Sequence, residues 1–521
     1  MKPILVRTHA VALTGITANI ISVETHVGSG LVSFNLVGMP DASVRESRDR
    51  VRAAMQSCGI DWFEHRVTVN LSPAGIPKAG SAFDLAIAVG LLAARGVLPP
   101  SVVDGTVFTA ELGLDGSLRP IRGILSSVLG AKREGMKQVV VSDRSLAEAQ
   151  LVPGVEILGF SHLRDLVTHF GGRLPSVLPP LLPKDILGQK KLVREVREHE
   201  QVDLADVKGQ SFAVEGLILA AAGGHHMLML GEPGAGKTML ARRLPTILPA
   251  LDDEDAIAAT AIHSVSGTFD SSTGLIRTPP IEMPHHSATM AAIIGGGSGV
   301  PRPGAISRAH AGVLVLDEAA EFSPQVLDAM REPLESGVVN LQRARHHVEY
   351  PARFQLILAS NPCPCGHAIS RRKSCTCSSI QQRRYLSRLS GPLLDRLDIQ
   401  IPMMTPSPAQ LAEPPAYSSK TAKEAVERAR ARARKRWAGT PWSLNAHVPA
   451  KLLRDPQYGI DSAVHKGIEH AIEDGTLSLR GATRVLRLAL TVADVRGADR
   501  AGLPELSKAL MFRNGVENAN A

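Results

Sequence analysis

The sequence predicts a mixed α/β fold built around a parallel β-sheet. Three observations lead to this expectation. Continuous apolar runs at residues 227–230, 312–316 and 354–359 are typical of strands that are buried on both faces, as in parallel sheets. The first run leads directly into a glycine-rich loop that is followed by a helical pattern. Aromatic residues make up only 3% of the chain, so the core must consist mainly of aliphatic side chains.

The composition limits the class of protein. At ~150 residues per domain, the 521 residues suggest about three domains. The formal net charge of +8 favours an anionic partner such as nucleic acid or nucleotide, with a solvated basic surface as the alternative. No run of ~18 apolar residues is present, so we expect no membrane-spanning helix and no membrane partner. Because Thr14, Gly15 and Thr17 interrupt the apolar region that a signal peptide needs, we expect a cytoplasmic protein.

The first domain is predicted to span residues 1–172 and to be α/β. Val67–Leu71 and Gln138–Ser142 have the composition of short strands, and Asp84–Ala94 has the pattern of an apolar helix. A linker is predicted at 173–185, because four prolines fall between Leu174 and Pro183. Proline continues neither a helix nor a central strand.

The second domain, predicted at 186–402, contains the glycine-rich loop. The loop has the pattern G-x-x-x-x-G-K-T in its required context, after a strand and before a helix. Its glycines let backbone N–H groups approach the triphosphate of ATP, its lysine is expected to contact the β- and γ-phosphates, and its threonine hydroxyl to bind Mg²⁺. The loop residues are Gly231, Glu232, Pro233, Gly234, Ala235, Gly236, Lys237 and Thr238.

Two acidic residues directly follow the second apolar run. Asp317 follows a buried strand and is therefore expected to hold Mg²⁺. Glu318 is expected to polarise the attacking water as a general base. A strand that ends in acids is common by itself, but here it follows a phosphate-binding loop in the same domain.

The third domain, predicted at 403–521, is rich in Ala, Arg and Leu and is expected to be helical. Its densest basic segment is 427–437. On a helix, Arg428, Arg432 and Arg436 share one face, while Arg430 and Arg434 point elsewhere. The segment is interpreted either as a solvated face or as a contact with DNA.

Four of the five cysteines lie close together within the second domain, in a predicted insertion at 363–377. They form two C-x-C pairs, and four thiolates suit a tetrahedral zinc ion. Structural zinc ligands more often have C-x₂-C spacing, so reduced thiols and a redox pair remain alternatives. The candidate zinc ligands are Cys363, Cys365, Cys375 and Cys377. The nearby Arg383, Arg384 and Arg388 could face a nucleic-acid backbone or solvent.

Several further motifs surround these elements. They are Gly209-Gln210, Pro284-His285-His286, Pro303-Gly304, His310, Asn361-Pro-Cys-Pro-Cys-Gly366 and Ser390-Gly-Pro-Leu-Leu-Asp-Arg-Leu-Asp398. Together with the loop and the acidic strand end, these motifs resemble, over nearly the whole chain, the ComM/YifB family of magnesium-chelatase-like AAA+ ATPases. The resemblance implies an AAA+ core with a helical lid formed by the third domain.

The resemblance also implies residue roles. Asn361 matches the first sensor position, which senses the γ-phosphate or orients water. Arg396 matches the arginine finger that enters a neighbouring subunit's site, and Arg480 matches the second sensor in the lid. One departure is that the family usually has arginines shortly before the histidine pair, whereas this chain has none at 279–284. For His285 and His286 we expect loop hydrogen bonding rather than metal binding.

The first domain resembles the proteolytic domain of Lon protease. The similar segment is Pro77–Asp84, and aligning it puts Ala82 at the position of the nucleophilic serine, with Ser81 one residue away. Leu125 stands where the partner lysine should be. A Ser–Lys dyad needs both a nucleophile and a base, so we expect no peptidase activity.

The family resemblance implies a homo-oligomeric ring, a hexamer, because an arginine finger completes the neighbouring site. The leading functional hypothesis is a DNA motor that uses ATP and Mg²⁺ for branch migration or unwinding in recombination and natural transformation. The alternatives are a magnesium-chelatase-type motor and a protein-remodelling ATPase, neither of which acts on DNA.

Overall fold

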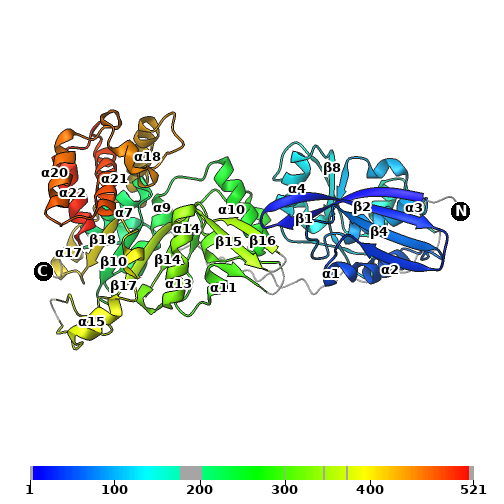
Figure 1. The fold of residues 1–521 in the computed structure, drawn as a ribbon, viewed down its shortest axis with the longest axis horizontal. Helices are drawn as coiled ribbons and strands as arrows, with labels where there is room; N and C mark the ends of the chain where they lie inside the picture. Colours follow the sequence, from blue (N-terminus) through cyan, green and yellow to red (C-terminus); the bar gives the residue numbers. More distant parts are fainter. Residues whose placement is uncertain (1–3, 176–201, 298–299, 344–345, 371–372, 516–521) are drawn as a thin grey trace.

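The computed structural model describes residues 4–175, 202–297, 300–343, 346–370 and 373–515, and most of the predicted linker lies outside these ranges. Two β-sheets, each with helices around it, lie next to one another along the long axis of the molecule (Figure 1). A block of helices formed by the last hundred residues covers the far end of the second sheet. The fold is therefore mixed α/β, as the sequence predicts.

The first sheet has seven strands in the order β3-β4-β2-β1-β5-β8-β9. The predicted strands are confirmed as β4 and β8, and the predicted helix is α3 (Asp84–Ala94), which is buried along its whole length. This burial explains why its sequence is apolar on every side. The strands are β1 (Ile4–Thr14), β2 (Thr17–Gly28), β3 (Ser33–Val37), β4 (Arg66–Ser72), β5 (Thr106–Phe108), β8 (Gln138–Ser142) and β9 (Glu156–Phe160).

The second sheet has five parallel strands in the order β11-β14-β17-β10-β18. The three predicted apolar runs form β10, β14 and β17, and every residue of these strands is buried. Because the strands are parallel, the segments that follow them leave the sheet at one edge. The strands are β10 (Met227–Gly231), β11 (Ile281–Glu282), β14 (Val313–Leu316), β17 (Gln355–Ser360) and β18 (Ile399–Met403).

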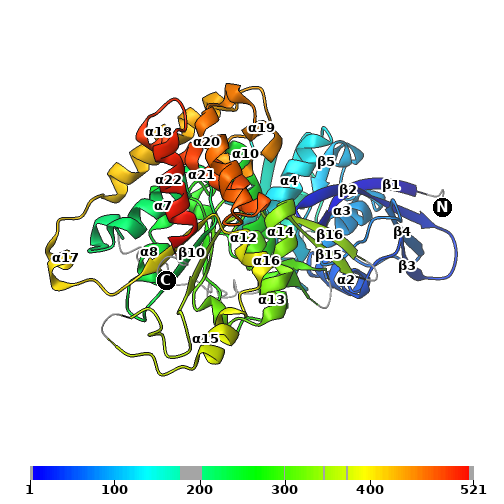
Figure 2. The ribbon, with the colours of Figure 1, turned by 60° about the vertical axis from the view of Figure 1, so that its left-hand side comes forward.

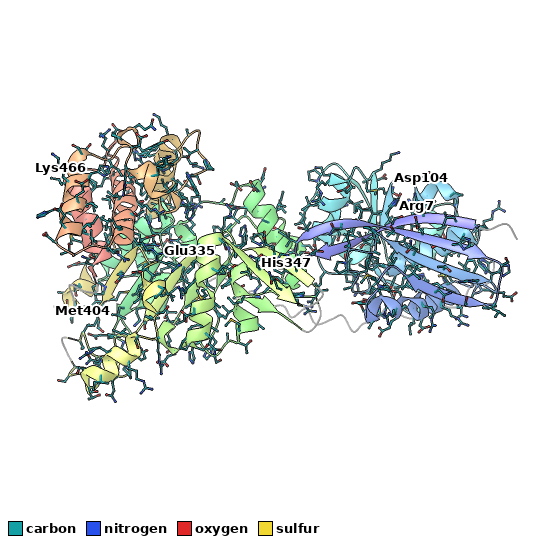
Figure 3. All side chains as sticks on the ribbon, viewed as in Figure 1. Arg7, Asp104, Glu335, His347, Met404 and Lys466 are labelled. Atoms are coloured by element: carbon teal, nitrogen blue, oxygen red, sulfur yellow. The ribbon has the colours of Figure 1, made fainter. Side chains whose placement is uncertain are left out.

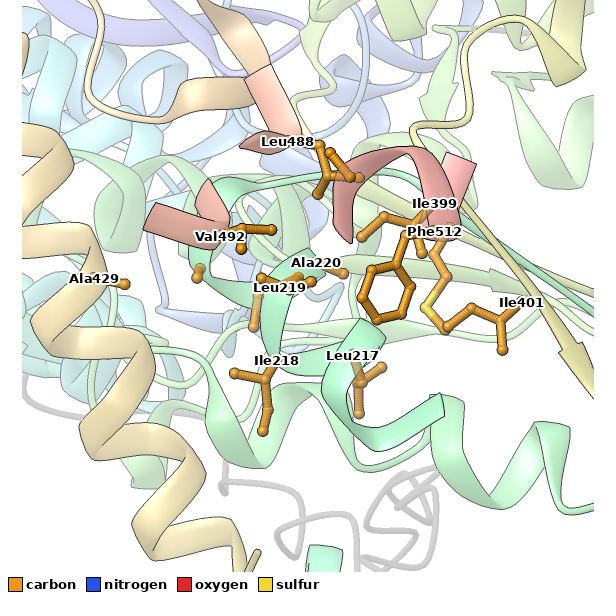
Figure 4. Packing of buried hydrophobic residues seen from close by; sticks show 14 of the residues in the cluster. Leu217, Ile218, Leu219, Ala220, Ile399, Ile401, Ala429, Leu488, Val492 and Phe512 are labelled. Carbon is orange, nitrogen blue, oxygen red and sulfur yellow. The ribbon is translucent and has the colours of Figure 1, made fainter. Parts of the chain in front are cut away.

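The helical block shares one hydrophobic core with the second sheet. Its main helices are α18 (Ser419–Arg436), α20 (Ser462–Glu473), α21 (Leu479–Arg496) and α22 (Leu503–Arg513), which gather at one end of the sheet (Figure 2). Helix α7 (Ser211–Gly223) lies between them and the strands. Figure 4 shows Leu217 of α7 beside Phe512 of α22 and Ile401 of β18. The ring of Phe512 also stacks on Phe212, with centroids 4.4 Å apart.

A buried polar network joins the same parts. His225 bonds Asp398 before β18 through Nδ1 (3.1 Å) and Thr491 of α21 through Nε2 (2.8 Å). In the same helix Asp494, which is 1% exposed, forms a bidentate pair with Arg436 at 2.5 and 2.8 Å. The side chain of Asn445 bonds both Thr491 and Asp494.

The basic segment at 427–437 is therefore only partly solvated. Besides Arg436, the guanidinium of Arg430 donates to the carbonyl of Ala221, and Arg432 donates to the carbonyl of Asp494. Arg428 and Arg434 are exposed. The interpretation of the whole segment as a solvated or DNA-binding face is wrong for Arg430, which joins α18 to α7, and for Arg436, which joins α18 to α21.

Two of the contacts between the part of the molecule around the first sheet and the part around the second are made by a hairpin and by a pair of helices. The hairpin of β15 (Val338–Arg343) and β16 (His346–Pro351) reaches β1, and Figure 3 shows His347 at this junction. Helix α4 (Ile124–Arg133) packs on α10 (Asp253–Ser266), where the Ser264 hydroxyl bonds the Glu148 carboxylate. Within the described ranges, the structure has no helix that is long and apolar enough to cross a membrane.

Candidate active site

The glycine-rich loop runs from the end of β10 to α8 (Lys237–Ala241), as predicted. Gly234 and Gly236 have φ angles of +80° and +90°, a region that residues with a Cβ rarely adopt. These conformations let successive backbone N–H groups line a concave anion site. The side chain of Gln210 holds the loop from behind by donating to the carbonyl of Ala235 at 3.0 Å.

Lys237 is the buried cation of this loop. Its ammonium group donates to the carbonyls of Gly231 (2.8 Å) and Glu232 (2.9 Å) and to Oδ1 of Asn361 (3.1 Å). Burial lowers the pKa of Lys237 to about 8, although the carboxylate of Asp317 acts in the opposite direction. A cation that has been desolvated in this way favours an anionic ligand strongly.

The residues that are expected to bind Mg²⁺ lie together. The hydroxyl of Thr238 donates to Oδ2 of Asp317 at 2.6 Å. Two oxygens on adjacent positions around an octahedral Mg²⁺ are about 2.9 Å apart, so this pair fits the first coordination shell of one ion with little adjustment. Both are hard oxygen ligands, as Mg²⁺ prefers.

Glu318 extends from the same strand end in an unusual conformation. Its φ angle is +53°, and its side chain is 55% exposed. Its carboxylate Oε2 lies 2.9 Å from Nδ1 of His286. Loop hydrogen bonding is the prediction for both histidines, and His285 does bond Ser287 through Nδ1 at 2.8 Å. The contact of His286 with the carboxylate of the predicted base is not among the predictions from the sequence.

Asn361 follows β17, the strand next to β10 in the sheet. Its contact with Lys237 brings the predicted sensor to the phosphate-binding loop. Five sequence-predicted residues therefore converge at one edge of the sheet: Lys237, Thr238, Asp317, Glu318 and Asn361.

The two predicted arginines lie together in a different pocket. Arg396 follows α16 (Gly391–Leu394), and its guanidinium pairs with the carboxylate of Glu335. Arg480 is exposed in the first turn of α21. Figure 3 labels Glu335 at the border with the helical block. The pocket does not include Lys237, and its lining residues are Glu335, Asp395, Arg396, Arg480, Thr483, Arg484 and Arg487.

The four clustered cysteines come together beside Asn361. Their sulfur atoms all lie within 4.8 Å of one another. Cys363 is buried, and the other three are partly exposed. Backbone N–H groups, with that of His367 as the largest contributor, lower the pKa of Cys365 to about 5.

The predicted Lon dyad positions carry no reactive groups. Ala82 precedes α3, and Leu125 is fully buried in the first turn of α4. The neighbouring Ser81 points its hydroxyl at the carboxylate of Glu111.

Comparison with known family models gives three matches. The model "Magnesium chelatase, subunit ChlI" matches residues 203–411, and its C-terminal counterpart matches residues 416–513. A further model, "Subunit ChlI of Mg-chelatase", matches residues 23–145.

Curated relatives are similar over nearly their full length. An uncharacterized protein of Mycobacterium tuberculosis is 43% identical over 507 residues, which cover 97% of this chain and 98% of the relative. YifB of Escherichia coli, also described as uncharacterized, is 39% identical over 508 residues, covering 97% and 96%. Competence protein ComM of Haemophilus influenzae is 38% identical over 506 residues, covering 96% of each chain.

A partial similarity links the chain to a protease. Lon protease 2 of Bacillus subtilis is 27% identical over 149 residues, which are 28% of this chain and 26% of the protease. This match agrees with an N-terminal α/β domain of the Lon type.

Proposed function

The chain belongs to the ComM/YifB family of magnesium-chelatase-like AAA+ ATPases, and from this premise we propose that it is a ring-forming motor that hydrolyses ATP to move DNA branch points. The observation that carries the ATPase part is the convergence of Lys237, Thr238, Asp317, Glu318 and Asn361 at one sheet edge. Membership in the AAA+ family is consistent with this chemistry.

Each of these side chains has a separate task in the proposed reaction. The loop amides and Lys237 would hold the phosphates, and Thr238 and Asp317 would hold Mg²⁺. When bound, Mg²⁺ would supply charge stabilisation at the transferring phosphoryl group. Glu318 accepts a proton from the attacking water, and Asn361 orients that water or reads the γ-phosphate.

Ring assembly, with six subunits as the family implies, explains the second pocket. Arg396 and Arg480 share a pocket that lacks the loop lysine of their own chain. In a head-to-tail ring this surface would meet the nucleotide of the next subunit. Both guanidinium groups then stabilise the negative charge that develops on the γ-phosphoryl group, and the Arg396–Glu335 pair must open to release the finger.

The DNA part of the proposal rests on charge and on one relative. The net charge of +8 favours a polyanion, and the relative ComM is named as a competence protein. Exposed Arg383, Arg384 and Arg388 lie in or beside α15 (Ser379–Leu386) and are candidates for phosphate contacts. Affinity for DNA should therefore fall steeply with salt, because each phosphate contact releases counterions.

A second candidate is a motor that does not act on DNA. The matching family models are named after a magnesium chelatase subunit, which favours a chelatase-type machine. The partial similarity to Lon protease 2 favours protein remodelling. Because Ala82 and Leu125 replace the dyad, we propose that no peptide bond is cleaved, and casein should stay intact in the presence of ATP.

The test is steady-state ATPase activity without DNA and with single-stranded DNA, duplex DNA and a branched junction. Glu318→Gln is the control, because it keeps the shape of the side chain but removes the base. Stimulation by DNA that disappears in Glu318→Gln supports the DNA motor. ATPase activity that does not change with any of the DNAs, but rises with casein or with porphyrin and a partner subunit, would favour the second candidate over the DNA motor.

A further inference from the structure

The sulfur atoms of the four clustered cysteines lie closer together than free thiols need to lie. The Cys363 and Cys365 sulfurs are 3.4 Å apart, those of Cys363 and Cys375 are 3.7 Å apart, and those of Cys365 and Cys375 are 3.5 Å apart. The sulfurs of a disulfide are bonded at about 2.05 Å, so no pair is a disulfide. Four sulfurs bound to one zinc at about 2.3 Å form a tetrahedron with edges of about 3.8 Å.

A side-chain donor also reaches the sulfur cluster. The amide of Gln382, a residue of α15, lies 3.3 Å from the sulfur of Cys375. Such a donor beside a sulfur is typical of the outer shell of a metal-bound thiolate.

The turn at Cys363–Gly366, called the cysteine turn here, is closed by a bond from the N–H of Gly366 to the carbonyl of Cys363 (2.9 Å) and also lies directly on the phosphate-binding loop. A Cβ placed on Gly366 would come within 2.6 Å of the Pro233 ring, so only glycine allows this approach. Gly366 also has a φ angle of +81°. On the other side, Asn361 is bonded to Lys237 and stands two residues before Cys363.

We propose that Cys363, Cys365, Cys375 and Cys377 bind one structural zinc ion, which fixes the cysteine turn against Pro233 and thereby holds Asn361 at the nucleotide site. All four positions of a tetrahedral ion are then filled by protein, so the ion has a structural and not a catalytic role. The four ligands close the long loop at 361–378 between β17 and α15, a segment that has few apolar residues to hold it together. A metal clip compensates for that small core.

The first experiment is metal analysis of the purified full chain. We expect one zinc per chain, and replacement by cobalt should give the intense sulfur-to-cobalt charge-transfer absorption of a tetrahedral thiolate site. Cys375→Ala should lower bound zinc by about tenfold or more after dialysis against a weak chelator. The matched control is Cys58→Ala, since Cys58 is a buried cysteine of the first sheet's core and should keep the full zinc content.

Three outcomes overturn the site: wild-type protein without zinc whose four thiols all react with an alkylating reagent, a disulfide found by mass spectrometry, or iron in place of zinc. The effect on nucleotide rests on the proposed ATPase function and is measured separately. Stripping zinc should weaken binding of an ATP analogue about tenfold. If zinc is present but the analogue never binds, the ATPase proposal fails while the zinc site stands. If stripping leaves the affinity unchanged, the link from the cysteine turn to the nucleotide site fails.

Discussion

Nδ1 of His286 lies 2.9 Å from Oε2 of Glu318, so a histidine from the loop after β11 restrains the carboxylate of the proposed general base. Glu318 has a positive φ angle and a half-exposed side chain, and it therefore has few other restraints. His286 is a positioning residue in this arrangement, because it acts through Glu318.

We predict that His286→Ala lowers kcat about tenfold while KM changes by less than about twofold. The loss is smaller than the 10²–10⁴-fold contribution of a general base, because the carboxylate itself remains. The control is His285→Ala, since the ring of His285 packs against that of His286 but bonds Ser287 instead of Glu318. Equal losses in the two variants would mean that the loop matters only as a whole.

The pKa of Lys237 predicts a pH dependence of nucleotide binding. Burial lowers this pKa to about 8, whereas the phosphates of a bound nucleotide raise it again. Above pH 8, binding must therefore take up a proton, and affinity for an ATP analogue should fall by up to about tenfold per pH unit. Below pH 8 the ammonium is already charged, and the affinity should be nearly constant. Titrations of a fluorescent analogue across this range measure the effect.

The lowered pKa of Lys237 makes the free energy of unfolding change with pH in the opposite direction to the affinity for nucleotide. Lys237 binds a proton more readily in the unfolded chain than in the folded one. Below pH 8 its burial therefore lowers the stability of the fold by the full amount. This loss shrinks as the pH rises from 8 toward the pKa of the unfolded lysine. Lys237→Arg provides the control for the binding experiment, because a guanidinium keeps its charge throughout. A binding curve with the same slope in Lys237→Arg would assign the pH dependence to another group.

Complementation between inactive subunits tests the proposed action of Arg396 across the ring. Arg396→Ala should lower kcat by about 10³-fold or more with little change in nucleotide binding. Glu318→Gln should also be inactive. In an equal mixture, about a quarter of the interfaces combine an intact Glu318 with an intact Arg396 from the next chain, so activity should return. Absence of recovery, in rings shown to exchange subunits, would place Arg396 in the site of its own chain.

The buried pair of Arg436 and Asp494 predicts a large effect on stability. Arg436→Ala leaves a carboxylate that is 1% exposed without its partner, which should cost about 3–5 kcal/mol. Arg434→Ala, on the exposed side of the same helix, should change stability by less than about 0.5 kcal/mol. Denaturation followed by tryptophan fluorescence reports on this region, because Trp437 is next to Arg436 and donates to Asn445, whose side chain also bonds Asp494. Similar midpoints for the two variants would contradict this account.

Features that depend on local spacing could be predicted from the sequence. The buried strands of the second sheet, the loop with Lys237 and Thr238, and the acidic pair after β14 each follow from a few neighbouring residues. Parallel strands then bring these segments to one edge of the sheet. The arrangement of the whole site could therefore be predicted once its separate motifs were identified.

Features that depend on partners distant in the chain could not be predicted from the sequence. Arg436 has the pattern of a solvated residue, and only the fold brings Asp494, which is 58 residues away, to its guanidinium. The contact of His286 with Glu318 likewise depends on the path of a loop that has no regular structure. The number of clustered cysteines suggested zinc as one of several alternatives, but nothing in the sequence indicated that Gly366 would rest on Pro233.

The core that α7 shares with β18, α21 and α22 has a mechanical consequence. Swinging the final helices away from the sheet would expose side chains such as Phe512 and Leu488 and would break the bonds of His225 to Asp398 and Thr491. Each Å² of apolar surface that is exposed costs about 25 cal/mol, so the shared core opposes such an opening. We therefore expect the sheet and the final helices to move together. In the proposed ring, we expect the movement of each ATPase cycle to occur at the interface between subunits. There the phosphates of the nucleotide bound to one chain lie next to the arginines of the next chain.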